Sequence, residues 1–209
     1  MARRCFSSAA TWSDSLLTVF LLSPASCAGT RAQLLLKSQT SPLTARLANG
    51  GAPLGEVFSF MSSLYFRGKL AYANAFGRAF VITPWRGLLP PDVLIRVEDL
   101  RKMATVPVDE AEAAFTGPLV RDATALHRGM APDDRVVLLG SVATDKYVGP
   151  LLNVFGDRLL FPPTFAGRGD MSRGGLLLRC AQSGTPLEYE PVRGAVRHGP
   201  KPPRLPRLK

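Results

Sequence analysis

The chain has few of the side chains that build metal centres and disulfide frameworks. It contains three cysteines and two histidines in 209 residues. Cys5, Cys27 and Cys180 are far apart and form no CxxC pair. Such a sparse, odd set argues against a disulfide scaffold and a structural zinc site, and two histidines are too few for a His-rich metal site. We therefore expect no metal, and reduced thiols in a cytoplasmic protein.

Several motifs of nucleotide-dependent and hydrolytic enzymes are also missing. The sequence has no Walker A motif, no Rossmann G-x-G-x-x-G after a strand and no G-x-S-x-G nucleophile motif. We therefore expect no bound cofactor. No stretch approaches the roughly 20 consecutive apolar residues of a membrane span, so the sequence predicts no integral membrane association.

The apolar run at residues 16–22 (LLTVFLL) has two interpretations. Followed by Cys27 and preceded by an arginine pair, it is similar to a lipoprotein signal, which would make this an exported lipoprotein. The run is short, however, and Pro24 stands where such a signal has an aliphatic residue. The alternative is the first buried strand of a sheet, with residues 23–30 as its carboxyl-terminal loop and residues 1–13 as a disordered N-terminus.

Strands and helices alternate along the rest of the chain. Further buried strands are predicted at residues 79–83, 136–139 and 159–161, and a last strand, at an edge, at 187–192. Helices are predicted at 56–76, 118–127, after Thr144 and from Asp170, and a helical turn at 97–103. We expect one apolar face along the whole of 56–76 and an irregular loop at 85–92. Pro150 should either kink its helix or split it after Val148. This alternation predicts a single three-layer α/β domain over residues 14–192 with a mostly parallel sheet.

Polar and glycine residues follow the predicted strands. Open α/β sheets place ligands at the carboxyl ends of their strands, where helix N-termini and arginines suit an anion. The predicted ligand-binding residues are Ser26, Thr30, Arg86, Gly140, Ser141, Gly167, Arg168 and Asp170. Two alternatives stand beside this prediction: the glycines only permit tight turns, and Asp170 only caps its helix.

Basic residues exceed acidic ones, 26 to 16, so the formal net charge is +10. Such a surplus favours nucleic acid or another phosphorylated partner, although a solvated basic surface explains it too. Residues 193–209 contain no acidic residue and many prolines, which predicts a flexible basic tail. The tail either aids solubility or contacts phosphates, and the predicted nucleic-acid-binding residues are Arg193, Arg197, Lys201, Arg204, Arg207 and Lys209.

Four short stretches together resemble one protein family. They are LLSPASCAGT at residues 21–30, LYFRGKLAYA at 64–73, ITPWRGLLPPD at 82–92 and YVGPL at 147–151. The chain is similar here to the YaaA family of peroxide-stress proteins and their uncharacterised relatives. The resemblance implies an α/β fold, association with DNA and a role in oxidative-stress protection. Some relatives accompany enzymes of deazaguanine modification, and their sheet is similar to that of uracil-DNA glycosylases.

The leading hypothesis is an α/β protein that binds nucleic acid or a nucleotide-like anion at strand-end loops, in stress protection or nucleic-acid modification. A second hypothesis is an enzyme acting on a nucleobase or nucleoside. In that case Asp145 or Asp170 would be the general acid or base, and Ser26 or Thr30 would position the substrate. The third is the exported lipoprotein described above.

Overall fold

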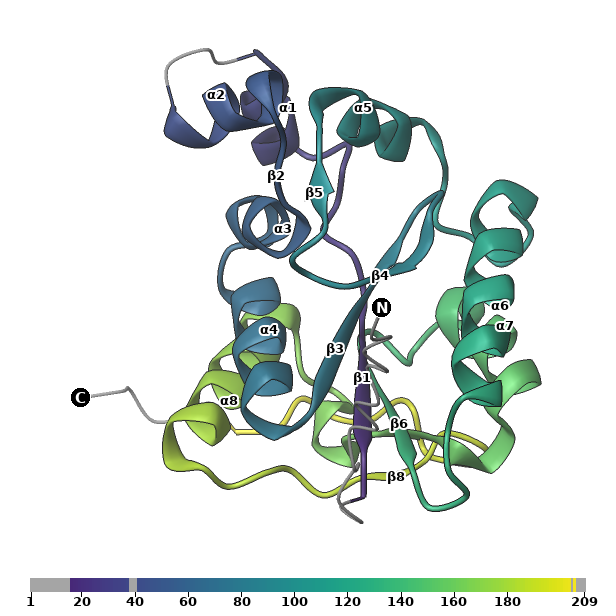
Figure 1. Ribbon diagram of the computed structural model, residues 1–209. Helices are drawn as coiled ribbons and strands as arrows, with labels where there is room; N and C mark the ends of the chain where they lie inside the picture. Colours follow the sequence, from purple (N-terminus) through teal and green to yellow (C-terminus); the bar gives the residue numbers. More distant parts are fainter. Residues whose placement is uncertain (1–15, 38–40, 204, 206–209) are drawn as a thin grey trace, which may run out of the picture.

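The computed structural model describes residues 16–37, 41–203 and 205 (Figure 1). The main sheet in this part of the chain has six strands. Their spatial order is β4 (Gly87–Leu89), β3 (Arg78–Thr83), β1 (Thr18–Leu22), β6 (Arg135–Leu139), β7 (Leu159–Phe161) and β8 (Glu190–Pro191). The four central strands are parallel and the two edge strands are antiparallel. The predicted α/β class and mostly parallel sheet are therefore confirmed.

Strand β1 lies at the centre of the sheet because it is apolar on both faces. It pairs with β3 on one side and with β6 on the other. Successive side chains of a strand point to opposite faces. Accordingly Phe20 and Leu22 belong to one hydrophobic core, while Val19 and Leu21 belong to a second. A continuous apolar run is what a strand covered on both faces requires.

Helices cover both faces of this sheet (Figure 1). Helices α4 (Leu64–Phe76) and α8 (Asp170–Ser183) pack on the first core, and α6 (Ala113–Arg128) and α7 (Asp145–Phe155) pack on the second. The chain leaves β1 towards one face and β6 towards the other. The carboxyl ends of β1 and β6 therefore form a topological switch point, the usual ligand position in open α/β sheets.

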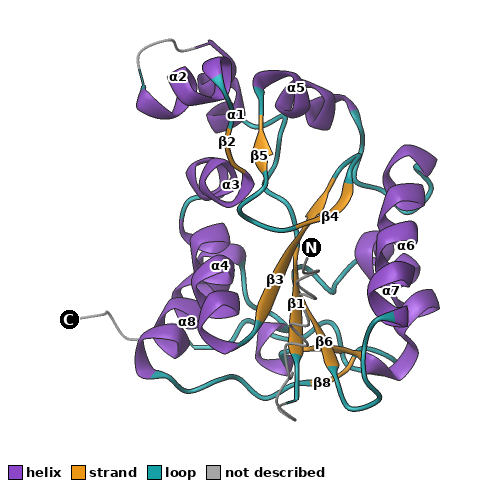
Figure 2. Ribbon diagram, viewed as in Figure 1, coloured by secondary structure: helices purple, strands orange, loops and turns teal. Residues whose placement is uncertain are grey.

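The remaining elements lie above the carboxyl ends of the strands, as Figures 1 and 2 show. They are α1 (Thr30–Lys37), α2 (Pro42–Asn49), β2 (Ala52–Pro53), α3 (Leu54–Ser62), β5 (Leu94–Ile95) and α5 (Val97–Thr105). Strands β2 and β5 form a small antiparallel pair. A short 3-10 helix, η1 (Gly156–Arg158), precedes β7, and another, η2 (Pro163–Phe165), follows it.

The predicted single helix at 56–76 is wrong. The structure has two helices, α3 and α4, separated at Ser63, which has φ 52°. The break turns the chain, so that α3 lies over the strand ends and α4 runs along the sheet (Figure 1). Apolar residues keep a spacing of three and four across the break, and therefore the pattern alone predicts one continuous face.

Three further predictions need correction. The loop at 85–92 contains edge strand β4, which pairs with β3. Helix α6 begins five residues before Pro118, because the Glu112 side chain accepts a hydrogen bond from the Ala114 N–H at 3.0 Å and caps it. Helix α7 continues through Pro150, so it is not split after Val148. In both helices the residue after the proline, Leu119 in α6 and Leu151 in α7, is buried, and this burial offsets the backbone bond that proline cannot donate.

The last predicted strand and the predicted cap of α8 also differ from the structure. Only Glu190–Pro191 pairs with β7, so the strand expected over 187–192 is short. Gly169 is the N-cap of α8, and Asp170 is the first helical residue instead of the cap.

Among the described residues, no helix has both the length and the apolar composition needed to cross a bilayer.

Candidate functional site

The loops that follow β1 and β6 lie side by side, as expected from a parallel sheet. The Ser23 N–H donates a hydrogen bond to the Leu139 carbonyl at 3.2 Å. A Cβ on Gly140 would lie 2.9 Å from the Cβ of Ser23. Glycine is therefore needed at 140 for the two loops to pack this closely. This closeness leaves Gly140 buried, with its backbone against Ser23.

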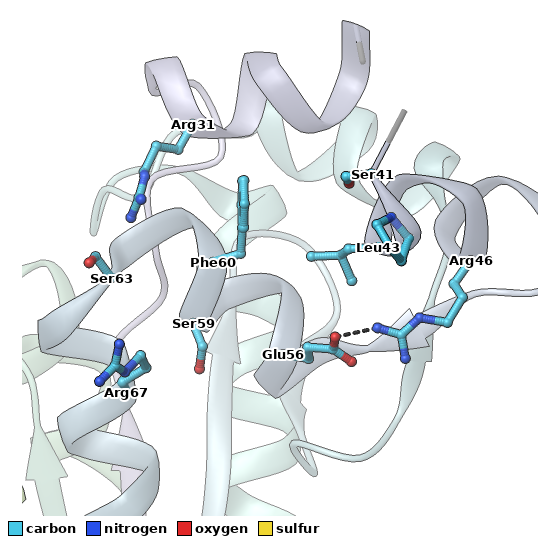
Figure 3. A pocket seen from close by; sticks show the side chains of 10 residues that line it. Arg31, Ser41, Leu43, Arg46, Glu56, Ser59, Phe60, Ser63 and Arg67 are labelled. Carbon is cyan, nitrogen blue, oxygen red and sulfur yellow. Dashed lines mark hydrogen bonds and ion pairs between the residues drawn. The ribbon is translucent and has the colours of Figure 1, made fainter. Parts of the chain in front are cut away.

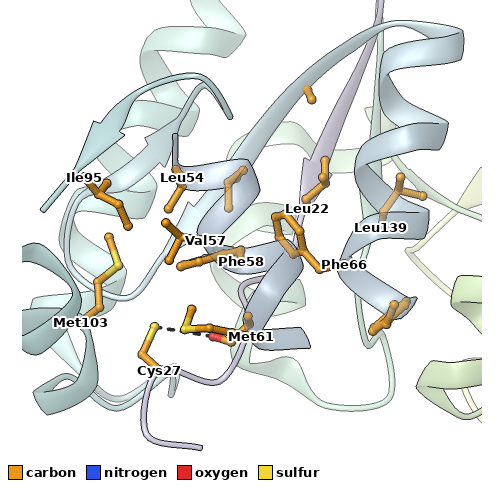
Figure 4. Packing of buried hydrophobic residues seen from close by; sticks show 14 of the residues in the cluster. Leu22, Cys27, Leu54, Val57, Phe58, Met61, Phe66, Ile95, Met103 and Leu139 are labelled. Carbon is orange, nitrogen blue, oxygen red and sulfur yellow. Dashed lines mark hydrogen bonds between the residues drawn. The ribbon is translucent and has the colours of Figure 1, made fainter. Parts of the chain in front are cut away.

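The predicted crevice above β1 is filled by hydrophobic side chains. Ala25 and Cys27 turn inward and join a core that includes Met61 of α3 and Met103 of α5 (Figure 4). Burial raises the pKa of Cys27 to about 12, so its thiol stays protonated. Two side chains of loop 23–29 therefore fill space above the end of β1, and the ligand position predicted there stays a prediction.

The predicted ligand-binding residues near β1 and β3 do not converge on one space. Ser26 and Thr30 are exposed, and Thr30 begins α1. Arg86 forms an ion pair with Asp99 at 3.2 Å. Its guanidinium is therefore occupied by a carboxylate of α5. Ser141 is half-buried in the loop after β6.

The predicted loop 167–170 is occupied by contacts within the protein. Arg168 donates to the Thr164 carbonyl at 3.0 Å and to Ser172 Oγ at 3.1 Å. Gly167 has φ 70°, and a Cβ there would lie 2.2 Å from the Pro200 carbonyl oxygen of the C-terminal segment. Both Asp145 and Asp170 occupy the first turn of a helix with an arginine beside them, which favours a carboxylate there.

The sequence reasoning missed a lysine that is fully buried beside this switch point. Lys69 Nζ donates to the Ser23 carbonyl at 2.6 Å and to Ser23 Oγ at 2.9 Å. The amine also lies 4.3 Å from the centre of the Tyr65 ring and 5.0 Å from that of Phe66. Burial lowers the pKa of Lys69 to about 7. Lys69 lies four residues after Tyr65 and three before Tyr72, and this helical spacing is the sequence signal that could have predicted its burial.

Two glycines bring Arg173 towards this lysine. A Cβ on Gly68 would lie 2.5 Å from the Gly174 carbonyl oxygen, and one on Gly174 would lie 2.7 Å from the Leu64 carbonyl oxygen. Helices α4 and α8 therefore touch through their backbones. Arg173 is buried and donates to the Phe165 carbonyl at 2.9 and 3.2 Å.

Tyr65 completes what we call the buried donor cluster, formed by Tyr65, Lys69 and Arg173. The Tyr65 hydroxyl is buried and has no hydrogen-bond partner of good geometry. Burial raises the pKa of Tyr65 to about 12, and the nearby positive charge of Arg173 partly opposes that rise. The lysine and the arginine each donate to a carbonyl in the loops after β1 and β7. The cluster therefore ties these two loops to helices α4 and α8.

An open cavity lies elsewhere, between α1, α2, α3 and the start of α4 (Figure 3). Its volume is about 540 Å³. We call it the arginine-lined cavity, and its lining residues are Arg31, Ser41, Pro42, Leu43, Arg46, Glu56, Ser59, Phe60, Ser63 and Arg67. The three arginines of the lining, Arg31, Arg46 and Arg67, lie 15 and 21 positions apart in the sequence, so no local sequence motif predicts that they come together.

The charges in this cavity are not balanced. Arg46 forms an ion pair with Glu56, the single carboxylate of the lining. Within the described part of the chain, Arg31 and Arg67 make no ion pair with a carboxylate. Ser63, whose backbone has a positive φ, lies between these two side chains (Figure 3). Non-glycine residues with such strained backbones occur often at functional sites.

The C-terminal segment lies against the domain as far as it is described. Arg193 forms an ion pair with Asp157 at 2.7 Å, and Arg197 forms one with Asp145 at 2.6 Å. Lys201 is exposed. The predicted contacts at Arg204, Arg207 and Lys209 lie outside the described residues. Two of the predicted nucleic-acid-binding arginines thus already have carboxylate partners, contrary to the expectation of a free tail.

Comparison with known proteins returned no match among family models, curated proteins or solved structures. Among the described residues, no group of three or more His, Cys, Asp or Glu side chains is placed to hold a metal ion. The chemistry of the cavity and of the donor cluster is therefore the basis for assigning a function.

Proposed function

We propose that this protein binds nucleic acid or a nucleotide-like anion through the arginine-lined cavity. The observation that carries this proposal is the pair Arg31 and Arg67, which line a hollow of about 540 Å³ and make no ion pair with a carboxylate in the part of the chain that the structure describes. A guanidinium stays charged at any physiological pH and presents a planar fork of donors that matches phosphate oxygens. The formal net charge of +10 adds a long-range attraction for polyanions.

The cavity supports anion binding better than the strand-end loops do. At the loops, the buried donors are already bonded to backbone carbonyls, and Arg86 and Arg168 have partners within the protein. In the cavity, the guanidinium groups of Arg31 and Arg67 make no ion pair with a carboxylate of the described residues, and Ser59 and Ser63 line the same hollow. A cytoplasmic role in stress protection or nucleic-acid modification, as the family resemblance implies, belongs to the same proposal.

The test compares two charge-matched double variants for binding to a labelled oligonucleotide over a series of salt concentrations. Arg31→Gln with Arg67→Gln should weaken binding by about tenfold or more. It should also reduce the salt slope, that of the logarithm of the binding constant against the logarithm of the salt concentration, by about 1 to 2, because fewer counterions are released when fewer phosphates are contacted. Arg128→Gln with Arg135→Gln removes the same charge from exposed sites at the other end of the sheet. Equal losses in both double variants, or salt-independent binding, would contradict the proposal.

Removal of residues 193–209 tests the tail separately. This segment carries several basic residues and no acidic one, so its removal should also reduce the salt slope. The reduction should come mainly from residues beyond Arg197, because Arg193 and Arg197 are engaged by Asp157 and Asp145. If the truncated protein kept the same salt slope of binding, the tail would not contact phosphates and would serve solubility instead.

A further inference from the structure

We infer that the arginine-lined cavity holds one unpaired nucleotide, with its phosphate between Arg31 and Arg67 and its base against Phe60. This inference rests on the proposed function and specifies the ligand of the same cavity. The nucleotide is either a free one or one unit of a single strand, and both sources share the same chemistry.

The phosphate end is formed where α1 faces the junction of α3 and α4. Arg31 comes from α1 and Arg67 from α4, and their side chains lie on the same side of the cavity with Ser63 between them (Figure 3). Two guanidinium groups and a hydroxyl offer several donors to one phosphate, and charge-assisted bonds of this kind are the strongest that a protein makes. No acidic side chain lines this end.

The middle of the cavity is apolar and aromatic, which inorganic phosphate alone would not require. Phe60 stands in the middle of the cavity, with Leu43 on the side away from Arg31 (Figure 3). The Arg31 guanidinium carbon lies 5.5 Å from the centre of the Phe60 ring. A base stacks on an aromatic ring whatever its identity, because every base has a π-face. An aromatic ring beside an unpaired guanidinium therefore suits a nucleotide.

The size and shape of the cavity favour an unpaired nucleotide over a duplex. A volume of about 540 Å³ falls within the usual range of small-ligand sites. A base inside a duplex is stacked on both faces, so a duplex can offer this cavity only its phosphates. Ser59 and the Arg46–Glu56 ion pair line the same hollow and supply polar groups for the edge of an unpaired base.

The experiment measures binding of four probes to the full chain: inorganic pyrophosphate, a nucleoside 5′-monophosphate, a single-stranded oligonucleotide and the duplex of the same sequence. We expect the single strand to bind about tenfold or more tightly than the duplex, because stacking adds to the phosphate contacts. If the monophosphate competed with the single strand, a free nucleotide would be sufficient to occupy the cavity. Binding of the strand without such competition would identify a unit of nucleic acid.

Phe60→Ala and Phe60→Leu test the aromatic contact directly. Both should remove most of the preference for the single strand and leave duplex binding nearly unchanged, because the arginines remain. Phe60→Leu keeps an apolar side chain next to the core, so it provides the measurement if the alanine variant does not fold. Equal binding of strand and duplex by the wild type, or an unchanged preference in both variants, would overturn the inference and leave the proposed function standing. Absence of binding to every probe would overturn both.

Discussion

Lys69 and Arg67 stand two residues apart on helix α4, and their cationic groups meet opposite environments. Lys69 is fully buried and donates to Ser23, whereas Arg67 is exposed at the edge of a cavity. Each residue advances about 100° around a helix, so positions two apart point to different sides. One helix thus supplies a donor to the interior of the sheet domain and a charge to the cavity above it.

The difference between the two environments decides what each group can do. Burial removes the hydration of the lysine amine and lowers its pKa to about 7, so part of the population is neutral at physiological pH. Its hydrogen bonds are used within the protein. Arg67 is exposed, and no carboxylate of the described residues pairs with it and would compete with a ligand. We therefore expect substitutions in the buried donor cluster to change stability and substitutions in the arginine-lined cavity to change binding.

The largest effect should come from Gly174→Ala. A Cβ at this position would lie 2.7 Å from the Leu64 carbonyl oxygen, so helices α4 and α8 would have to separate and draw Arg173 away from Tyr65. We expect the free energy of unfolding to fall by about 3 kcal/mol, at the upper end of the usual cost of overpacking. Chemical denaturation measured by circular dichroism gives this value.

Gly175→Ala is the matched control for this change. Its Cβ would meet only a Leu205 methyl carbon at 3.8 Å, so the substitution is sterically free. Alanine should then stabilise the helix by up to about 1 kcal/mol through its higher helix propensity. If both variants lost the same stability, the close approach of Gly174 to the Leu64 backbone would not be the cause.

Lys69→Met should change how stability depends on pH. A lysine has a pKa of about 10.4 in an unfolded chain, and burial lowers the pKa of Lys69 to about 7 in the folded protein. Between these values the unfolded state binds more protons, so the wild type gains stability as pH rises. Relative to the methionine variant, this gain should be about 1.4 kcal/mol per pH unit above pH 7. Below pH 7 the difference between the two proteins should be constant.

Unfolding curves at several pH values from about 6 to 8.5 measure this difference. This range is chosen because the model-peptide pKa values of cysteine and tyrosine lie at or above it. The raised pKa of Cys27 acts in the opposite direction only at higher pH, where the unfolded thiol ionises first. Lys102→Met provides the control, since Lys102 is exposed. A constant difference between wild type and Lys69→Met across the window would show that the buried amine does not titrate there.

Arg67→Gln should have the smallest effect on stability. Its side chain is exposed and makes no ion pair with a carboxylate among the described residues, so we expect a change within about 0.5 kcal/mol. A small gain in stability is expected if Arg31 and Arg67 repel each other in the empty cavity. Thermal unfolding with and without a saturating oligonucleotide separates the effect of Arg67 on stability from its effect on ligand binding. A large loss of stability without ligand would remove the contrast between the cavity and the donor cluster.

The four parallel strands were within reach of sequence reasoning because each is a short apolar run that ends at a glycine, proline or polar loop. The same reasoning correctly placed helices at 97–103 and after Thr144. It failed at Ser63, where the apolar spacing continues across a sharp break. It also failed at β4, because the Gly and Pro residues of that loop hide a three-residue edge strand whose pairing with β3 is a tertiary contact.

The candidate site was less predictable than the fold. Parallel pairing does bring Ser23 and Gly140 together as expected. The space above them is nevertheless filled, because loop 23–29 turns Ala25 and Cys27 into the core. Whether a loop at a strand end leaves an open crevice depends on which of its side chains point inward. That choice is set by the packing of α3 and α5, elements that come later in the chain.

By itself, the sequence determined the central strands, their burial on both faces and the basic surplus, because periodicity, apolar runs and charge are local or additive properties. Tertiary structure alone decided which cations remain available to a ligand. Arg31, Arg46 and Arg67 become neighbours only when α1, α2 and α4 meet around α3. Lys69 becomes buried only because α4 packs against the sheet and, at Gly68, against α8. Desolvation and proximity arise from packing, and they separate a buried lysine from an exposed, cavity-lining arginine two residues away.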